Sequence, residues 1–149
     1  MLKLTEHTLK EIQAHGSASY PHEGCGLLLG RAEYGENVAV AIFPVPNRWE
    51  NEEEKSYRFL IHDQDMLQVE LAAAAQDLDV IGIFHSHPDH PPDASLRDLA
   101  WAAWSGYSYL ITEVRQGQPG RSRSWQLLID RSGFKEETVE IGDFANSAS

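Results

Sequence analysis

The residues of this chain best suited to chemistry lie in the segment HSHPDHPPDASLRD, residues 85–98. It follows the run VIGIF, residues 80–84, whose apolar character is typical of a strand buried on both faces. Side chains two positions apart on a strand point to the same side, so His85 and His87 would present two ring nitrogens in one direction. Two imidazoles arranged in this way predict a metal site.

A third ligand must come from elsewhere, because a catalytic zinc ion usually takes three ligands from the protein and leaves the fourth place to water. We expect Asp98, since the proline-rich loop after the histidines can fold the first turn of the next helix back over the strand end. Asp89 and Asp93 are the local alternatives. Ser95 and Asp98 also fit the S-x-x-D pattern of a helix capping box, which is a purely structural interpretation of Asp98.

The joint spacing is more specific than any of its parts. The segment matches H-x-H-P, six residues, then S-x-x-D, with a glutamate upstream in PHEGCGLLLG. This pattern resembles that of the JAMM, or MPN-plus (Mov34/JAB-type), zinc metallopeptidases, and in particular their small bacterial stand-alone members. The resemblance implies one zinc ion per chain with His85, His87 and Asp98 as its ligands. It implies Glu23 as the general acid/base and Ser95 as a hydroxyl that helps to steady the tetrahedral intermediate.

The chemistry of this residue set follows from general principles. A zinc ion lowers the pKa of its bound water from about 16 to near 7, so hydroxide is available at neutral pH. Glu23 precedes a run of small and apolar residues, where partial desolvation would raise its proton affinity and suit it to proton transfer. Gly24 and Gly26 predict room for the close approach of a substrate backbone.

The elements that must position these residues can be read from hydrophobic periodicity and from the turn residues. Together they predict one mixed β-sheet flanked by helices, an α/β (α+β) fold, and the resemblance specifies the JAMM/MPN fold, which is cytidine-deaminase-like. The tail from about 143 to 149 is expected to be disordered. The expected strands are 2–4, 25–30, 38–46, 56–61, 80–84 and a meander of 107–114, 123–129 and 134–141; the expected helices run from Thr5 to Gly16, from about 62 to 78 and from near 95 to 106; and 47–55 is expected to be a loop.

Composition limits the class of protein. A length of 149 residues fits a single domain, residues 1–149. The formal net charge of -11 argues against nucleic acid as a partner. The single cysteine cannot form an internal disulfide, the N-terminus has no apolar signal-peptide core, and no stretch is long enough to span a membrane, so the cytoplasm is the expected location.

The resemblance implies a function for the whole chain. It implies a zinc-dependent, isopeptidase-like metallopeptidase that hydrolyses an amide bond at the C-terminal Gly-Gly tail of a ubiquitin-like or sulfur-carrier protein. The product released would be an amino acid such as cysteine or a short extension.

Three other interpretations stay open from the sequence. The chain could be a non-catalytic MPN-type module that binds proteins. The letters HSHPDH also satisfy the H-x-H-x-D-H motif of the metallo-β-lactamase superfamily, although no histidine follows His90 to complete that site. Cys25 with His22 could form a nucleophilic pair, but a lone cysteine in an apolar strand usually serves core packing.

Overall fold

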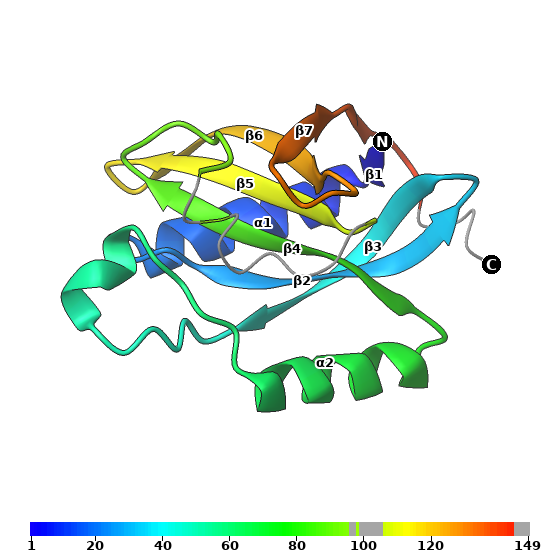
Figure 1. The fold of residues 1–149 in the computed structure, drawn as a ribbon, viewed down its shortest axis with the longest axis horizontal. Helices are drawn as coiled ribbons and strands as arrows, with labels where there is room; N and C mark the ends of the chain where they lie inside the picture. Colours follow the sequence, from blue (N-terminus) through cyan, green and yellow to red (C-terminus); the bar gives the residue numbers. More distant parts are fainter. Residues whose placement is uncertain (96–97, 99–105, 145–149) are drawn as a thin grey trace.

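A curved, mixed β-sheet forms the centre of the computed structural model, which describes residues 1–95, 98 and 106–144 (Figure 1). Eight strands lie in the order β7-β6-β5-β4-β2-β3-β1-β8. The sheet and its flanking helices confirm the mixed α+β fold. The strands are β1 (Leu2–Leu4), β2 (Cys25–Glu33), β3 (Glu36–Val45), β4 (Asp79–Pro88), β5 (Ser108–Arg115), β6 (Gln118–Leu127), β7 (Phe134–Glu137) and β8 (Val139–Ile141); the helices are α1 (Glu6–Ser19), α2 (Asp63–Ala75) and the short 3-10 helix η1 (Glu52–Ser56).

The central strand is β4, which pairs antiparallel with β2 and parallel with β5. It runs beyond the predicted 80–84 to Pro88, so both histidines of the motif lie within regular strand structure. Its side chains alternate between the two faces, as a strand requires. Ile83 belongs to a core cluster with residues of α2, whereas Phe84 belongs to a second cluster with residues of α1. His85 and His87 therefore share the face of Ile83, away from α1.

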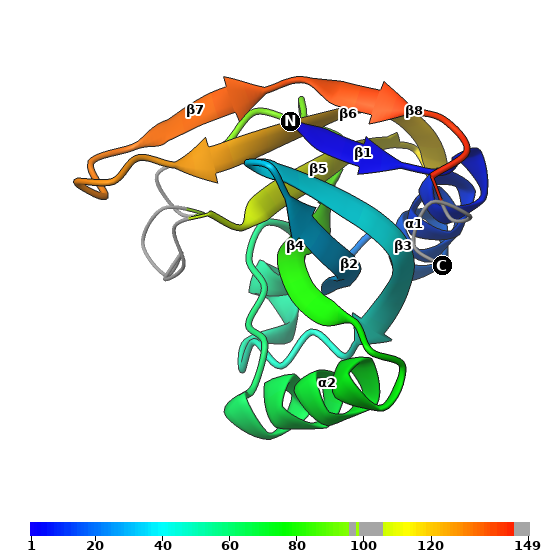
Figure 2. The ribbon, with the colours of Figure 1, turned by 90° about the vertical axis from the view of Figure 1, so that its right-hand side faces the viewer.

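The sheet curls until its two outer strands meet. β7 and β8 are consecutive in the chain and are separated only by Thr138, whose carbonyl accepts a hydrogen bond of 2.9 Å from Leu2 N. Figure 2 shows the two strands following one another across the top of the molecule. The prediction of one strand over 134–141 is therefore wrong, because the chain changes partner from β6 to β1 at this residue.

Helix α1 covers the face of the sheet opposite the histidines. Thr5 caps its N-terminus, accepting a hydrogen bond of 3.0 Å from Thr8 N, as predicted. Gly16 does not end the helix, which continues to Ser19. A Cβ atom at Gly16 would lie 3.1 Å from Val114 and 3.2 Å from Ser86. This glycine therefore permits close packing of the helix on the sheet.

The predicted strand over 56–61 does not form. Residues 57–62 have no regular structure, and the predicted loop before them contains η1. The cause is the Asn47 side chain, which donates to Arg58 O at 2.9 Å and accepts from Leu60 N at 3.2 Å. Because these backbone groups bond to an amide side chain, they are not available for a strand ladder.

Two predictions fall largely on residues outside the described ranges. The helix predicted from near 95 to 106 includes residues 96–97 and 99–105, and the predicted disordered tail includes 145–149. Of that tail, Phe144 is described and lies under the Lys3 ammonium, 5.5 Å from Nζ to the ring centroid. Among the residues described, no helix has the length and apolar character needed to cross a membrane.

Gly82 provides a test of the packing in the centre of the sheet. A Cβ atom there would lie 2.2 Å from Ser108 O on the neighbouring strand β5. We expect Gly82→Ala to lower the free energy of unfolding by about 2 kcal/mol, because the backbone of one strand must move. Urea unfolding measures this loss. Gly120→Ala is the matched control, since its Cβ would meet no atom closer than 3.5 Å, and equal losses for both variants would contradict the packing described.

Candidate metal centre

Three side chains, two from β4 and one from beyond the loop that follows it, converge at the end of β4. His85 Nε2 lies 3.1 Å from His87 Nε2 and 3.1 Å from Asp98 Oδ1. His87 Nε2 lies 3.5 Å from Asp98 Oδ2. Both histidine side chains are 2% exposed and that of Asp98 is 12% exposed. The structure thus brings together the three residues that the sequence predicts as metal ligands.

The separations fit the coordination of a zinc ion. Nitrogen and oxygen ligands lie about 2.0 to 2.2 Å from zinc, so two ligands of a tetrahedron are about 3.3 to 3.6 Å apart. The observed distances of 3.1 to 3.5 Å are close to this value. Two imidazole nitrogens and a carboxylate oxygen also form a donor set that zinc prefers.

The ring of His87 is fixed in the tautomer that a metal ligand needs. Its Nδ1 lies 2.7 Å from Pro91 O, and a carbonyl oxygen can only accept a hydrogen bond. Nδ1 therefore carries a proton, which leaves Nε2, pointing at His85 and Asp98, as the atom for a metal ion. The ring of His85 is held differently, by stacking on Phe59 at a centroid distance of 4.4 Å.

Asp98 has a structural contact in addition to its place in the cluster. Its Oδ2 accepts hydrogen bonds of 2.9 Å from both the backbone nitrogen and the hydroxyl of Ser95, and Ser95 Oγ accepts from Asp98 N at 3.1 Å. These are the reciprocal bonds of a capping box. The capping interpretation is therefore confirmed, and it is compatible with the metal-binding one because Oδ1 faces His85.

The site favours a positive charge next to Asp98. Burial alone would raise the pKa of this carboxyl group, but the charges and hydrogen bonds of His85 and His87 hold the pKa well below its usual range. The carboxylate is therefore ionised at neutral pH. An anion that is largely removed from solvent is stabilised by a nearby cation, and a metal ion would supply one.

The two alternative aspartates are engaged elsewhere. Asp89 accepts a hydrogen bond of 2.5 Å from the Tyr20 hydroxyl, which contributes most to lowering the pKa of this carboxyl group. Asp93 lies 2.5 Å from the guanidinium of Arg123 on β6. Neither belongs to the cluster with His85, and both instead tie the loop before Asp98 to the rest of the protein.

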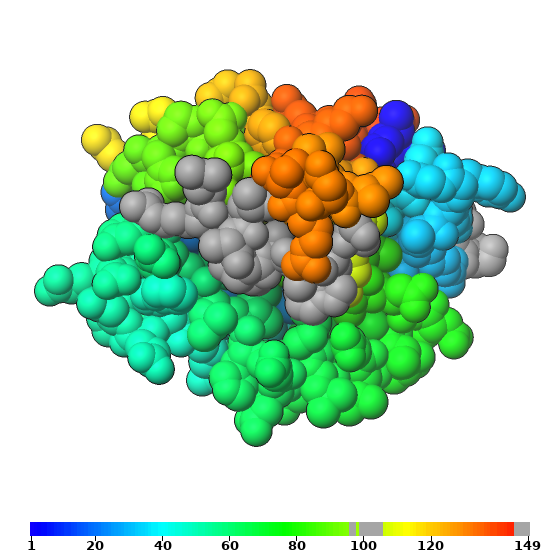
Figure 3. All heavy atoms as spheres, in the orientation of Figure 1, coloured from blue at the N-terminus to red at the C-terminus, as the bar shows by residue number. Residues whose placement is uncertain are grey.

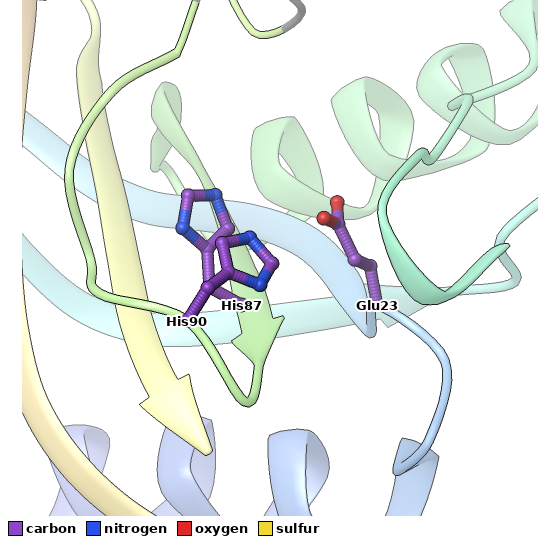
Figure 4. A group of neighbouring side chains, drawn as sticks. All are labelled: Glu23, His87 and His90. Atoms are coloured by element: carbon purple, nitrogen blue, oxygen red, sulfur yellow. The ribbon is translucent and has the colours of Figure 1, made fainter. Parts of the chain in front are cut away.

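Glu23 lies beside the cluster, as the sequence predicts. It is 2% exposed, and its backbone is held by hydrogen bonds from its N to Lys55 O, 2.6 Å, and from Asn47 Nδ2 to its O, 3.0 Å. Ligand-type atoms of Glu23, His87 and His90 all lie within 4.8 Å of one another. Figure 4 shows the Glu23 side chain rising beside the two imidazole rings.

His90 is a residue of the site that the sequence interpretation assigned no role. Its ring stacks on that of His87 at a centroid distance of 4.1 Å, and its Nδ1 lies 2.8 Å from Pro88 O. The only signal in the sequence is its place in HSHPDH, and the JAMM spacing leaves that position unspecified.

The prediction that Gly24 and Gly26 leave room for a substrate by lacking a side chain is wrong. A Cβ atom at Gly24 would lie 2.5 Å from the hydroxyl of Ser19, and one at Gly26 would lie 2.4 Å from the ring of Phe84. The space in the Cβ direction of both glycines is filled by the protein's own side chains, although the backbone of Gly24 lines a cavity of about 220 Å³ beside Glu23. They are required by internal packing on the α1 side of the sheet.

Cys25 is not placed for nucleophilic catalysis. It is 0% exposed, and burial together with the charge of Glu23 raises the pKa of its thiol to about 12. Its sulfur is directed at the backbone oxygens of Val45 and Pro46. His22 instead faces Glu52, with 4.0 Å between Nε2 and Oε2. The proposed pair of Cys25 and His22 is therefore not formed.

The comparisons with known proteins agree with this geometry. The family model described as prokaryotic homologs of the JAB domain matches residues 5–128. A desampylase from Pyrococcus furiosus is 34% identical over 140 residues, which cover 94% of this chain and 90% of the relative. A probable TtuB-protein conjugate cleaving protease from Thermus thermophilus is 31% identical over 96 residues, which cover 64% of this chain and 60% of the relative.

The fold has a close counterpart among solved structures. A protein of Desulfitobacterium hafniense superposes with a TM-score of 0.83 at 26% identity, over 95% of this chain and 93% of the other. The chain belongs to the prokaryotic family of JAB-domain proteins. This membership removes the metallo-β-lactamase alternative.

The state of Cys25 can be tested directly. Because the raised pKa keeps the thiol protonated at neutral pH, we expect the native protein to resist a thiol-alkylating reagent and to react fully once unfolded in denaturant. Intact-mass spectrometry measures the extent of labelling. Rapid labelling of the native protein would contradict the burial described here.

The hydrogen bond from Trp125 Nε1 to Pro92 O, 3.1 Å, provides a test of how the loop positions Asp98. We expect Trp125→Phe to weaken zinc binding about tenfold, because the loop loses this hydrogen bond while an aromatic ring still occupies the position. Competition with a chromophoric chelator measures the affinity. Trp49→Phe is the matched control, since it removes a similar bond to Glu54 on η1, and an equal loss of affinity there would contradict a specific role for the Trp125 tether.

Proposed function

We propose that this protein is a zinc-dependent, isopeptidase-like peptidase. Its substrate would be the C-terminal Gly-Gly tail of a ubiquitin-like or sulfur-carrier protein, and it would hydrolyse the amide bond that follows the tail. An amino acid such as cysteine or a short extension would be released. The observation that carries this proposal is the convergence of His85, His87 and Asp98 with Glu23 beside them, in a chain of the JAB family.

The relatives support the class of substrate. Two of them are a desampylase and a probable TtuB-protein conjugate cleaving protease. The second name describes a protease that cleaves a protein conjugate, which is the type of bond that we propose for this chain.

The proposed roles of the residues follow from their positions. His85, His87 and Asp98 would hold one zinc ion, which when bound acts as a Lewis acid and makes water more acidic. Glu23 would accept the proton of the attacking water and pass it to the leaving amine. Its burial suits this task, because desolvation raises the proton affinity of a carboxylate.

Ser95 would steady the tetrahedral intermediate with its hydroxyl group. This hydroxyl now donates to Asp98 Oδ2, and a serine hydroxyl has one proton to donate. It would therefore have to rotate from Asp98 toward the substrate as the intermediate forms. In the state described here, Ser95 instead orients a proposed ligand.

A surface next to the site suits a protein substrate. A cavity of about 310 Å³ lies between the segment after η1 and helix α2, and it is lined by Leu60, Ile61, Asp63, Met66, Leu67, Glu70 and Ile83. Ile83 is two residues before His85 on the same face of β4. Leu67 and Leu71 on α2 are 56% and 64% exposed, and exposed apolar side chains of this kind are typical of protein interaction surfaces. The space-filling view in Figure 3 places α2 along the lower edge of the molecule.

Cleavage and metal content together test the proposal. The zinc-loaded protein is mixed with a sulfur-carrier protein that is extended after its Gly-Gly tail, and intact-mass spectrometry follows the product with and without a chelator. We expect Glu23→Gln to keep zinc but to lose at least about 100-fold in turnover, because the proton acceptor is gone. His87→Ala should lose both zinc and turnover.

Glu53→Gln on η1 is the matched control for the loss of a carboxylate, and it should cleave at the parental rate. Unchanged turnover of Glu23→Gln would refute its role, and unchanged zinc affinity of His87→Ala would refute the ligand assignment. Tight binding of the extended carrier without any cleavage by the zinc-loaded parent would favour the non-catalytic binding module instead.

A further inference from the structure

A second group of metal-binding side chains lies next to the proposed zinc ligands. It consists of Glu23, His87 and His90, whose ligand-type atoms are all within 4.8 Å of one another. Glu23 and His87 are buried, and His90 is half-buried at the edge of the site. Figure 4 shows that Glu23 approaches the two rings from a different part of the chain. Two metal ions could thus lie close together, with His87 between them.

His87 cannot supply a nitrogen to both ions. Its Nε2 points at His85 and Asp98, and its Nδ1 is engaged by Pro91 O at 2.7 Å. The protein ligands of a second ion are therefore Glu23 and His90, and solvent completes the coordination shell.

The ring of His90 is in a suitable state for this role. Its Nδ1 lies 2.8 Å from Pro88 O, and because the carbonyl can only accept, the proton must be on Nδ1. The lone pair is then on Nε2, the nitrogen left for a metal ion. The stacking contact with His87 holds the ring beside the first site.

We propose that Glu23 and His90 form a second, weaker zinc site, and that zinc bound there inhibits the peptidase. The site is weaker because it offers two protein ligands where the first offers three, and because a second dication is repelled by the first. Inhibition follows from the proposed function, in which Glu23 must accept a proton. A carboxylate that is bound to a metal ion is a weaker base, because the cation withdraws electron density from both oxygens, so it accepts this proton less readily.

Zinc stoichiometry tests the second site without any substrate. Zinc is titrated into the metal-free full-length protein, and the number of ions bound is measured by calorimetry and by elemental analysis after gel filtration. We expect two ions per chain for the parent, the first bound more tightly. His90→Asn should bind one ion, because its amide can still donate to Pro88 O but it lacks the imidazole Nε2.

His62→Asn is the matched control for this substitution. His62 caps α2, accepting a hydrogen bond from Gln64 N at 3.2 Å, and asparagine is a good N-cap residue. This variant should still bind two ions. Far-ultraviolet circular dichroism checks that both variants are folded.

Cleavage of the extended carrier protein then tests inhibition. We expect the rate of the parent and of His62→Asn to fall as zinc is added beyond one equivalent, and the rate of His90→Asn to stay at its own one-equivalent value. The inference is overturned if the parent saturates at one ion, if His90→Asn still binds two, or if the second ion raises the rate.

The outcomes also separate this inference from the proposed function. If no tight ion binds, or if the loaded protein cleaves no extended carrier, the proposed function fails and inhibition fails with it. If one tight ion binds and the carrier is cleaved, but no second ion binds, only the second site is refuted.

Discussion

Two buried imidazoles and one buried carboxylate meet within 3.5 Å of one another at the end of β4. Such an arrangement favours a cation, because the carboxylate has lost most of its hydration and two imidazole nitrogens face each other at 3.1 Å. A metal ion would satisfy both groups. The low pKa of Asp98 points the same way, because positive charge beside this carboxyl group stabilises its ionised form.

The strand and the loop around this cluster hold its three side chains in fixed positions. β4 is paired by both β2 and β5 at His85, whereas His87 lies beyond the ladder with β2 and pairs with Glu113 of β5. Backbone hydrogen bonds to β5 therefore fix the spacing of the two histidines. The loop that brings Asp98 back is less regular, and it is tethered by polar contacts to the C-cap of α1, to β4 and to β6. A paired strand holds two of the proposed ligands and a tethered loop holds the third, an arrangement that would preorganise a metal site.

Much of the site was predictable because its signals are local or have a fixed spacing. The period of two places His85 and His87 on one face, and the S-x-x-D spacing predicts the capping box that orients Asp98.

What the sequence could not show depends on partners far away in the chain. The strand expected at 56–61 is absent because the Asn47 amide bonds to its backbone, and the strand expected at 134–141 is divided because its second half pairs with β1. The place of His90 in the site could not be predicted for the same reason, since only the folded chain brings it close to Glu23.

X-ray absorption at the zinc edge tests the central claim most directly. The full-length protein is loaded with one equivalent of zinc, so that the tightest site dominates the signal. The coordination proposed here predicts a shell of four nitrogen and oxygen atoms at about 2.0 to 2.1 Å, with the outer-shell scattering of two imidazoles. A sulfur ligand at about 2.3 Å, or a shell of oxygen atoms alone without imidazole scattering, would contradict it.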